Sequence, residues 1–576
     1  MSLALRRSFR VCRSGLHYRS PAHYKHQRHL HLGPQEEREL FSVTTSRWLY
    51  NDEQQRAVRY VPFDVQAFVD TAVKAANAKS CLSIEKIYDG SMNRVFELKL
   101  DNGVALIAKI PFPVAGPKHY CTASEVATMD YLHAVHGFHV PQVLAWCSRA
   151  ETTPVGTEYI IYEKLPGVPL REHDNNDLPL QDDPYISQHV LPRVQKVQSF
   201  LYRIGFTQIG SLYYKEDVHP SLRDRPLYKN GMKPPGAERF CIGPTVDREF
   251  WRAGRAALDI DRGPWSDMHS YLRAFAECAR ASVDAYPNPS IDDKYRRLIS
   301  DYERLIPHIA PKELRYILWH PDLSDGNLLV TETTQPCELL SVIDWQSTVI
   351  APEHMQLRTP PAYNARDHPL INYPDDLEMP TLRPEAESLE DEQKQLAARA
   401  LRKAHRKKAH EIYVREADPE LGKEMYDMIC SPGRRVITSP ATTITRGVED
   451  GLEAIEYSFL HCRTLWPFAV EIDDKGTPLI PFPIEISEDE EKRIKEQRAL
   501  RSQDEEMANP VLEQFGVLPE SEGEVGAEEY EAAKRAAEEA RQAVLDAAPT
   551  PEERERRAQA WPLQDGKVTW GTQLCC

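Results

Sequence analysis

The stretch from Tyr316 to Val330 constrains the fold of this chain more than any other feature. It contains two apolar, strand-like runs around a short polar turn, and the turn carries His320, Asp322 and Asn327 in the pattern His-x-Asp-x-x-x-x-Asn. Buried strands on either side of a turn hold its side chains rigidly, so Asp322 and Asn327 are expected to converge on one site. A later apolar run ends in a further carboxylate, Asp344.

This combination of two carboxylates and an amide matches what phosphoryl transfer requires. Asp322 can orient an attacking hydroxyl and accept its proton, so we predict that it is the catalytic base. The amide oxygen of Asn327 and the carboxylate of Asp344 are hard ligands, which suit a Mg²⁺ ion bridging nucleotide phosphates. We interpret His320 as a structural brace of the loop rather than as an acid or base.

Simpler interpretations of the same residues exist. His-Pro-Asp also occurs in J-domain co-chaperones, but there it joins two helices, whereas the runs flanking it here have the character of strands. Asp-Gly-Asn between two apolar runs could be a plain hairpin turn, and Asp344 could be a carboxylate that only ends a strand. The combination favours the kinase-like site.

The residues from His320 to Asn327, followed by Ile343-Asp344-Trp345, resemble the motifs of the aminoglycoside phosphotransferase and choline kinase-like family. Members of that family are small-molecule kinases built on the protein-kinase fold, and the resemblance, over roughly residues 60–350, is nearest to fungal mitochondrial members. It implies an α+β, bilobal, protein-kinase-like fold with a small antiparallel β lobe, a larger, mainly helical lobe and a C-terminal helical extension. The family's usual glycine and anchoring aspartate are not evident after Trp345.

Period-two patterning predicts the strands of the small lobe at 83–89, 94–100 and 104–110. The turn between the first two strands carries Gly90, Ser91 and Asn93, and it resembles the family's Gly/Ser-rich nucleotide loop, in which short residues let backbone N–H groups approach phosphates. Because the turn has a single glycine, a plain hairpin remains the alternative.

Lys109 lies in the third predicted strand, where both faces are apolar. A buried, unpaired ammonium is costly, so Lys109 must reach solvent or meet an anion. The resemblance implies that Lys109 binds nucleotide phosphates and that Glu125, in a helix predicted at 123–135, pairs with it. The alternative is that Glu125 only completes a capping box with Thr122.

The resemblance also places the hinge between the lobes at Tyr162 to Leu165. Backbone groups there would bond the adenine edge of ATP. An ordinary linker is the alternative, since side chains contribute little to such contacts.

Composition excludes several classes of protein. The 576 residues carry a formal charge of −17, which argues against nucleic acid as the main partner. No run of eighteen apolar residues occurs, so we expect no membrane span. The eleven cysteines form no C-x-x-C pair, and neither a zinc site nor a disulfide framework is indicated.

The N-terminal segment has the composition of a transit peptide. It is rich in arginine, and no Asp or Glu precedes Glu36, although the rest of the chain is acidic. This predicts import into mitochondria, with a disordered basic arm as the alternative. The terminal Cys575-Cys576 pair resembles a prenylation tail, but nothing else in the sequence supports that interpretation.

The predicted organisation has four parts. They are a transit peptide at 1–40, an N-terminal nucleotide-binding lobe at 60–165, a C-terminal catalytic lobe with substrate-side insertions at 166–480, and an acidic helical tail at 481–576. Within these parts the patterning also predicts a strand at Val140–Leu144, a short strand pair within 205–214, an inserted loop at 215–265 and tail helices that lack a strong apolar face. We expect a mitochondrial phosphotransferase that uses ATP and Mg²⁺ to phosphorylate a hydroxyl of a small molecule, with the tail as a surface for a protein partner. The alternative is a non-catalytic, pseudokinase-like scaffold in mitochondrial maintenance or inheritance, which the atypical glycine loop favours and the complete motif set disfavours.

Overall fold

The computed structural model describes residues 32–173, 190–229, 231–311, 314–332, 338–361, 369–374, 377–389, 391–428, 432–515, 517 and 522–566. Residues 1–31 of the predicted transit peptide (1–40) and the Cys575-Cys576 pair lie outside the described residues. Within the described part of the chain, no helix combines the length and the apolar character that a bilayer crossing requires.

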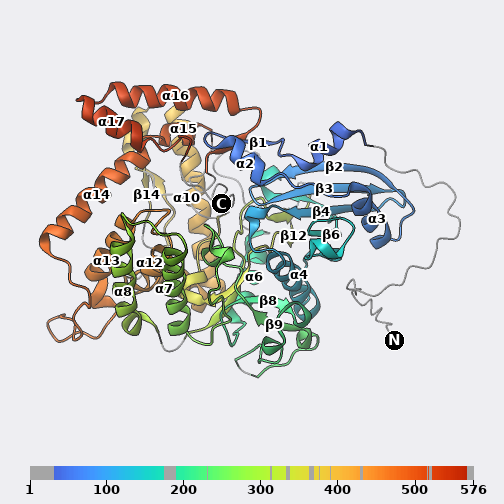
Figure 1. Cartoon of the computed structure of the whole chain (residues 1–576), viewed down its shortest axis with the longest axis horizontal. Coiled ribbons are helices and arrows are strands. Elements are labelled where there is room, and N and C mark those ends of the chain that lie inside the picture. The colour runs from blue at the N-terminus through green and yellow to red at the C-terminus, as the bar shows by residue number, and fades with distance from the viewer. Residues whose placement is uncertain are drawn as a thin grey trace.

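The N-terminal lobe is built on one five-stranded antiparallel sheet, in the order β2-β3-β4-β6-β5 (Figure 1). In chain order the strands are β2 (Cys81–Asp89), β3 (Asn93–Leu100), β4 (Ala105–Pro111), β5 (Val143–Cys147) and β6 (Tyr159–Glu163). The three strands predicted from period-two patterning are confirmed. The strand predicted from Val140 begins only at Val143, because Pro141 cannot donate a hydrogen bond to a sheet ladder.

Two helices pack against this sheet. α3 (Val65–Ala75) begins at Asp64, whose side chain accepts a hydrogen bond from the Ala67 N–H, and it buries Phe68 and Val69 against the strands. α4 (Tyr120–Asp130) is buried from Cys121 to Asp130, since it contacts β5 and β6 on one side and the second lobe on the other. α4 therefore lies at the junction of the two lobes.

The second lobe is mainly helical and contains the largest apolar core. Its longer helices are α6 (Leu191–Arg203), α7 (Met268–Ala285), α8 (Asp292–Ile309), α10 (Asp391–Ala417), α12 (Pro432–Ile444) and α13 (Leu452–Leu465). Figure 1 shows α7, α8, α12 and α13 gathered at the end of the molecule away from the sheet. The predicted fold class, a small antiparallel β lobe with a larger helical lobe, is confirmed.

Short antiparallel strands run through the second lobe. β10 (Tyr316–Trp319) pairs with β13 (Val349–Pro352), and β11 (Leu328–Val330) lies between β7 (Val168–Pro169) and β12 (Leu339–Val342). The strand pair that the sequence suggested within 205–214 is wrong: β8 (Ser211–Tyr214) pairs with β9 (Phe240–Gly243). The reason is that the backbone groups just before β8 are bonded to other segments, at Tyr316, Trp265 and Ile350.

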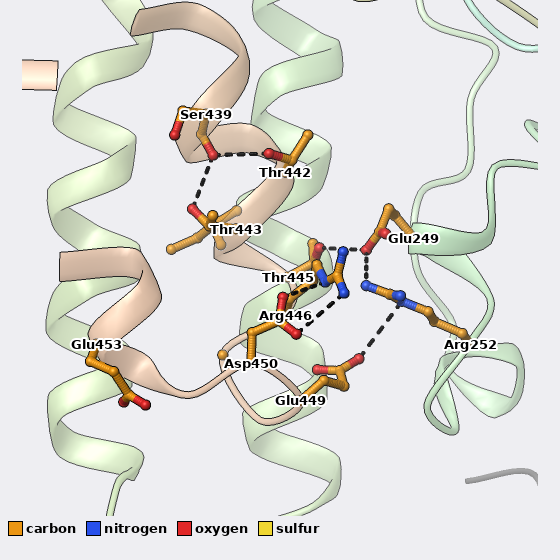
Figure 2. A network of polar contacts seen from close by, with 12 residues as sticks. Glu249, Arg252, Ser439, Thr442, Thr443, Thr445, Arg446, Glu449, Asp450 and Glu453 are labelled. Atoms are coloured by element: carbon orange, nitrogen blue, oxygen red, sulfur yellow. Dashed lines mark hydrogen bonds and ion pairs between the residues drawn. The ribbon is translucent and has the colours of Figure 1, made fainter. Parts of the chain in front are cut away.

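The predicted insertion at 215–265 is fixed to the helical end of this lobe by charged groups (Figure 2). Arg252 lies between two carboxylates, with Nη2 2.6 Å from Glu249 Oε2 and Nε 3.8 Å from Glu449 Oε1. The Thr445 hydroxyl donates to the same Glu249 oxygen at 3.1 Å. Moving the insertion away would leave these charges without partners, which is costly for buried groups. The network therefore holds the insertion against the turn between α12 and α13.

The C-terminal segment comprises α14 (Glu488–Glu506), α15 (Asn509–Gln514), β16 (Glu524–Gly526), α16 (Tyr530–Asp546) and α17 (Pro551–Ala560). The sequence suggested helices without a strong apolar face. This is confirmed for α14, which buries only Ile494, but is wrong for α16, which buries Tyr530, Ala533 and Leu545. Alanine-rich faces bury little area per residue, so the pattern of large apolar residues does not reveal them.

Candidate active site

Lys109, Glu125 and Asp344 meet at the junction of the two lobes. Lys109 Nζ, on β4, lies 2.8 Å from Glu125 Oε1 and 3.1 Å from Glu125 Oε2, and Glu125 belongs to α4. The same ammonium lies 2.6 Å from Asp344 Oδ1, in the segment that follows β12. The Lys109 and Glu125 side chains are 6% and 4% exposed, whereas Asp344 is 41% exposed. The carboxylate of Asp344 is thus the accessible member of the trio.

The trio contains one ammonium and two carboxylates, and each charged group shifts the pKa of its neighbours. Burial alone would lower the pKa of Lys109, but Asp344 and Glu125 together raise it above its usual value, so the ammonium stays charged. Burial raises the pKa of Glu125, and Lys109 opposes that effect. Burial would also raise the pKa of Asp344, but Lys109 holds it below its usual value. Two carboxylates around one ammonium leave a net negative charge that suits a divalent cation.

The alternative capping role of Glu125 is wrong. α4 begins at Tyr120, after His119, so Glu125 lies in the second turn rather than at the third helical position. Its carboxylate is bonded to Lys109 instead.

The predicted catalytic loop connects β10 to β11. Asn327 Nδ2 donates to the Asp322 backbone carbonyl at 2.9 Å and to Asp322 Oδ2 at 3.1 Å, so the two side chains lie together as the spacing predicted. Both bonds use the amide nitrogen, and the amide oxygen, the atom that would bind a metal, takes no part in them. Burial raises the pKa of Asp322. The J-domain alternative is wrong because strands, not helices, flank the loop.

His320 braces this loop. It is almost fully buried, its Nδ1 accepts a hydrogen bond from the Asp322 N–H at 3.1 Å, and its Nε2 lies 3.0 Å from the Ile343 carbonyl. The ring also meets Trp345 edge-on, with centroids 4.6 Å apart. Burial lowers the pKa of His320 to about 4, so the ring is neutral at physiological pH and the Nε2–H donates to Ile343.

We expect His320→Leu to lower the free energy of unfolding by about 1–3 kcal/mol, because the Asp322 N–H and the Ile343 carbonyl lose their partner. The difference from wild type should shrink as the pH falls from about 6.5 towards 4, since the unfolded chain protonates this histidine first and the native advantage is lost over that range. Urea denaturation at several pH values measures it, with exposed His269→Leu as the control. A difference that does not change with pH would contradict the buried neutral ring.

Asp344 is joined to the catalytic loop through the backbone. The Ile343 N–H donates to the Asn327 carbonyl at 3.0 Å, so the residue before Asp344 is bonded to the last residue of the catalytic loop, directly before β11. Asp344 has φ +62° and Ser347 has φ +60°. Aspartate tolerates this left-handed conformation better than most residues. Trp345, between these two residues, is fully buried.

The predicted nucleotide loop is closed as a hairpin, with the Gly90 N–H donating to the Asn93 carbonyl at 2.8 Å. A Cβ at position 90 would lie 2.8 Å from the edge of the Tyr88 ring, which is 47% exposed and would have to move aside. Asn93 exchanges two hydrogen bonds with the Gln346 side chain, at 2.9 and 2.8 Å, and so ties the sheet to the segment after Asp344. The Ser91 hydroxyl donates to Glu524 Oε2 at 2.7 Å.

At the predicted hinge, Tyr162 lies on β6 next to β4. Burial raises the pKa of Tyr162, and the nearby Lys109 ammonium opposes that effect. Leu165 follows and is half-buried. Gly167 has φ +120° and lies so close to the Val330 carbonyl that a Cβ would be only 2.4 Å from it. The hinge is therefore packed directly against the strand that leaves the catalytic loop.

Sequence reasoning missed three residues around the site. The Arg358 guanidinium donates to the Pro321 carbonyl inside the catalytic loop, and burial lowers its pKa while Asp322 opposes that effect. Gln346 and Glu524 bond the nucleotide loop from distant parts of the chain. None of the three belongs to a recognisable motif, so no local signal identifies them.

No group of three or more His, Cys, Asp or Glu side chains placed to hold a metal ion occurs among the described residues. This does not conflict with a site of the predicted kind. Mg²⁺ in nucleotide sites is held by one or two protein oxygens together with phosphates and waters.

A small antiparallel lobe carrying a buried Lys–Glu pair, joined through a hinge to a helical lobe with a His-x-Asp-x-x-x-x-Asn loop, defines a kinase-like fold. No family model matches the chain. It is 32% identical over 363 residues to the subtelomeric hrmA-associated cluster proteins of two Aspergillus fumigatus strains, covering 55% of this chain and 67% of each of those proteins, and it belongs to their family.

The chain is also similar to altered inheritance of mitochondria protein 9 from several yeasts. The Lachancea thermotolerans protein is 28% identical over 51% of this chain and 52% of its own length, and the Candida tropicalis protein is 24% identical over 78% and 80%. Among solved structures, it is similar to aminoglycoside phosphotransferase APH(4)-Ia, with 13% identity, a TM-score of 0.31 and 69% and 98% of the two chains covered.

Proposed function

We propose that this protein is a phosphotransferase that transfers a phosphoryl group from ATP, with Mg²⁺, to a hydroxyl of a small molecule. The observation that carries the proposal is the meeting of Lys109, Glu125 and Asp344 beside the loop that holds Asp322 and Asn327. In kinases, residues of these five types form the phosphate clamp, bind the metal and act as the base.

Each residue has a chemical task in this proposal. Asp322 orients the acceptor hydroxyl and takes its proton, and His320 fixes the backbone of Asp322. Lys109, held by Glu125, binds nucleotide phosphates, while the oxygens of Asn327 and Asp344 hold the metal. Mg²⁺, when bound, would offset charge on the transferred group. Gly90, Ser91 and Asn93 are proposed to form the nucleotide loop, and Tyr162 to Leu165 the adenine hinge.

We further propose a mitochondrial location. The basic, acid-free N-terminal segment supports it, and so does the name of the yeast relatives.

We expect Asp344→Asn to weaken Mg²⁺-dependent nucleotide binding by at least about tenfold, or ~1.4 kcal/mol, because the accessible carboxylate of the trio is replaced by a weaker ligand. The measurement is the nucleotide-induced thermal shift with Mg²⁺ and with a chelator, compared within each variant because the substitution also removes the charge that pairs with Lys109. Asp474→Asn, at an exposed position, is the matched control.

A non-catalytic scaffold is the second candidate. The hydrogen bonds that the Ser91 and Asn93 side chains make within the protein favour it, because these groups are already satisfied. The thermal-shift experiment, together with an ATP hydrolysis assay, separates the two candidates. Absence of nucleotide binding and of ATP turnover in the wild-type protein, unchanged by Asp344→Asn, supports the scaffold and contradicts the enzyme.

A further inference from the structure

A short segment of the C-terminal tail lies directly on the nucleotide loop. β16 pairs antiparallel with β1 (Ser46–Trp48), and Figure 1 shows the C-terminal segment crossing the molecule to reach β1 beside the N-terminal sheet. The Leu49 N–H extends the pairing by donating to the Gly523 carbonyl at 3.0 Å. The two strands are more than 470 residues apart in the chain, as their register Ser46↔Gly526 shows.

Ser91, at the tip of the loop, is held by two groups from outside it. Its hydroxyl donates to Glu524 Oε2 at 2.7 Å. Its backbone carbonyl accepts from Arg59 Nε at 3.0 Å, and the Arg59 guanidinium is stacked over the Trp48 ring at 4.6 Å. The hydroxyl of Ser91 is therefore bonded to the tail and its carbonyl to Arg59, and neither contact uses its backbone N–H.

The part of the tail around β16, which carries Glu524, is itself held by side chains of residues 51–59. Gln55 Nε2 donates to Glu522 Oε2 at 2.7 Å in a buried contact, and the same Gln55 accepts from Arg59 Nη1 at 2.5 Å. Further along the tail, the Gly566 N–H donates to Asn51 Oδ1 at 2.8 Å. These contacts fix the tail on both sides of β16.

A cation lies near Glu524. Burial lowers the pKa of Arg59, and the carboxylates of Glu524 and Glu522 oppose that effect. The guanidinium therefore offsets part of the negative charge that the two tail carboxylates place beside the loop.

We propose that Glu524 is a positioning residue for the nucleotide: through Ser91 it holds the loop 90–92 in the conformation that binds phosphates. This inference rests on the proposed function. A glycine-rich loop becomes ordered when a nucleotide binds and loses affinity in doing so, whereas this loop, with one glycine, is ordered in advance by the tail and by the Asn93–Gln346 pair.

The test is nucleotide affinity of full-length variants, measured with Mg²⁺ and a non-hydrolysable ATP analogue. We expect Glu524→Ala to raise the dissociation constant about three- to tenfold, with turnover at saturating ATP nearly unchanged. Glu524→Gln keeps an acceptor oxygen and should bind nearly as wild type does. Ser91→Ala combined with Glu524→Ala should be no worse than either alone, since both remove the same contact. Exposed Glu528→Ala is the matched control.

Hydrogen exchange of the peptide spanning 88–93 gives a second readout, which should rise in Glu524→Ala and not in the control. If the wild-type protein binds nucleotide and Glu524→Ala binds it equally well or more tightly, the positioning role is wrong and the proposed function stands. If the wild-type protein binds no nucleotide at all, the proposed function fails, and the positioning role fails with it.

Discussion

Asp322→Asn should lower turnover by about 10²–10⁴-fold while leaving nucleotide affinity within about twofold of wild type. The amide keeps the shape of the side chain and its contact with Asn327, but it cannot accept the proton of the acceptor hydroxyl. Turnover is measured as phosphate transfer to acceptors found by screening hydroxylated metabolites, and as ATP hydrolysis without an acceptor.

Asp325→Asn is the matched control in the same loop. The Asp325 carboxylate lies 4.0 Å from Arg406, on the helical side, so its loss should change turnover only a few-fold at most. Equal activity of Asp322→Asn and wild type would remove Asp322 as the base, whatever the nucleotide affinity.

Lys109→Met should have the largest effect on stability, lowering the free energy of unfolding by about 3–5 kcal/mol, because it leaves the buried Glu125 carboxylate without its cation. The double variant Lys109→Met/Glu125→Gln should recover a substantial part of this loss, since no buried charge is then left unpaired. Neither variant should bind nucleotide with wild-type affinity, because the phosphate clamp is missing from both. Chemical denaturation and nucleotide titration measure the two effects.

The exposed pair Lys99–Glu85 is the control, with its charged atoms 3.6 Å apart and its side chains 50% and 55% exposed. Lys99→Met should cost less than about 1 kcal/mol, because solvent screens such pairs. If the double variant is as unstable as Lys109→Met, packing rather than charge explains the loss. If it regains nucleotide binding, Lys109 is not the clamp.

The core of the candidate site could be predicted because its parts follow local rules. Lys109 in a strand with two apolar faces must reach solvent or meet an anion, and Asp322 and Asn327, five positions apart on one turn, are expected to converge. The helix that carries Glu125 was predicted within a few residues, but its first residue, which decides between ion pair and capping box, depends on how α4 packs between the lobes.

The contacts around the nucleotide loop could not be predicted. Gln346 and Glu524 reach the loop from 253 and 433 residues away, and the chain near them has no pattern that names a partner. The partner of β8 was predicted wrongly for the same reason: strand pairing depends on which segment lies alongside, and an insertion supplied a different one.

By itself, the sequence determined the strands of the small lobe through their periodicity, and its short motifs pointed, through their resemblance to a known family, to the two-lobed fold and to the candidate site residues, because periodicity and short motifs are set by neighbouring residues. Only the tertiary structure decided that Lys109 lies between Glu125 and Asp344, that His320 is buried and neutral, and that the tail closes on Ser91. These depend on contacts between distant segments, which form only when the whole core packs, and no local pattern specifies them.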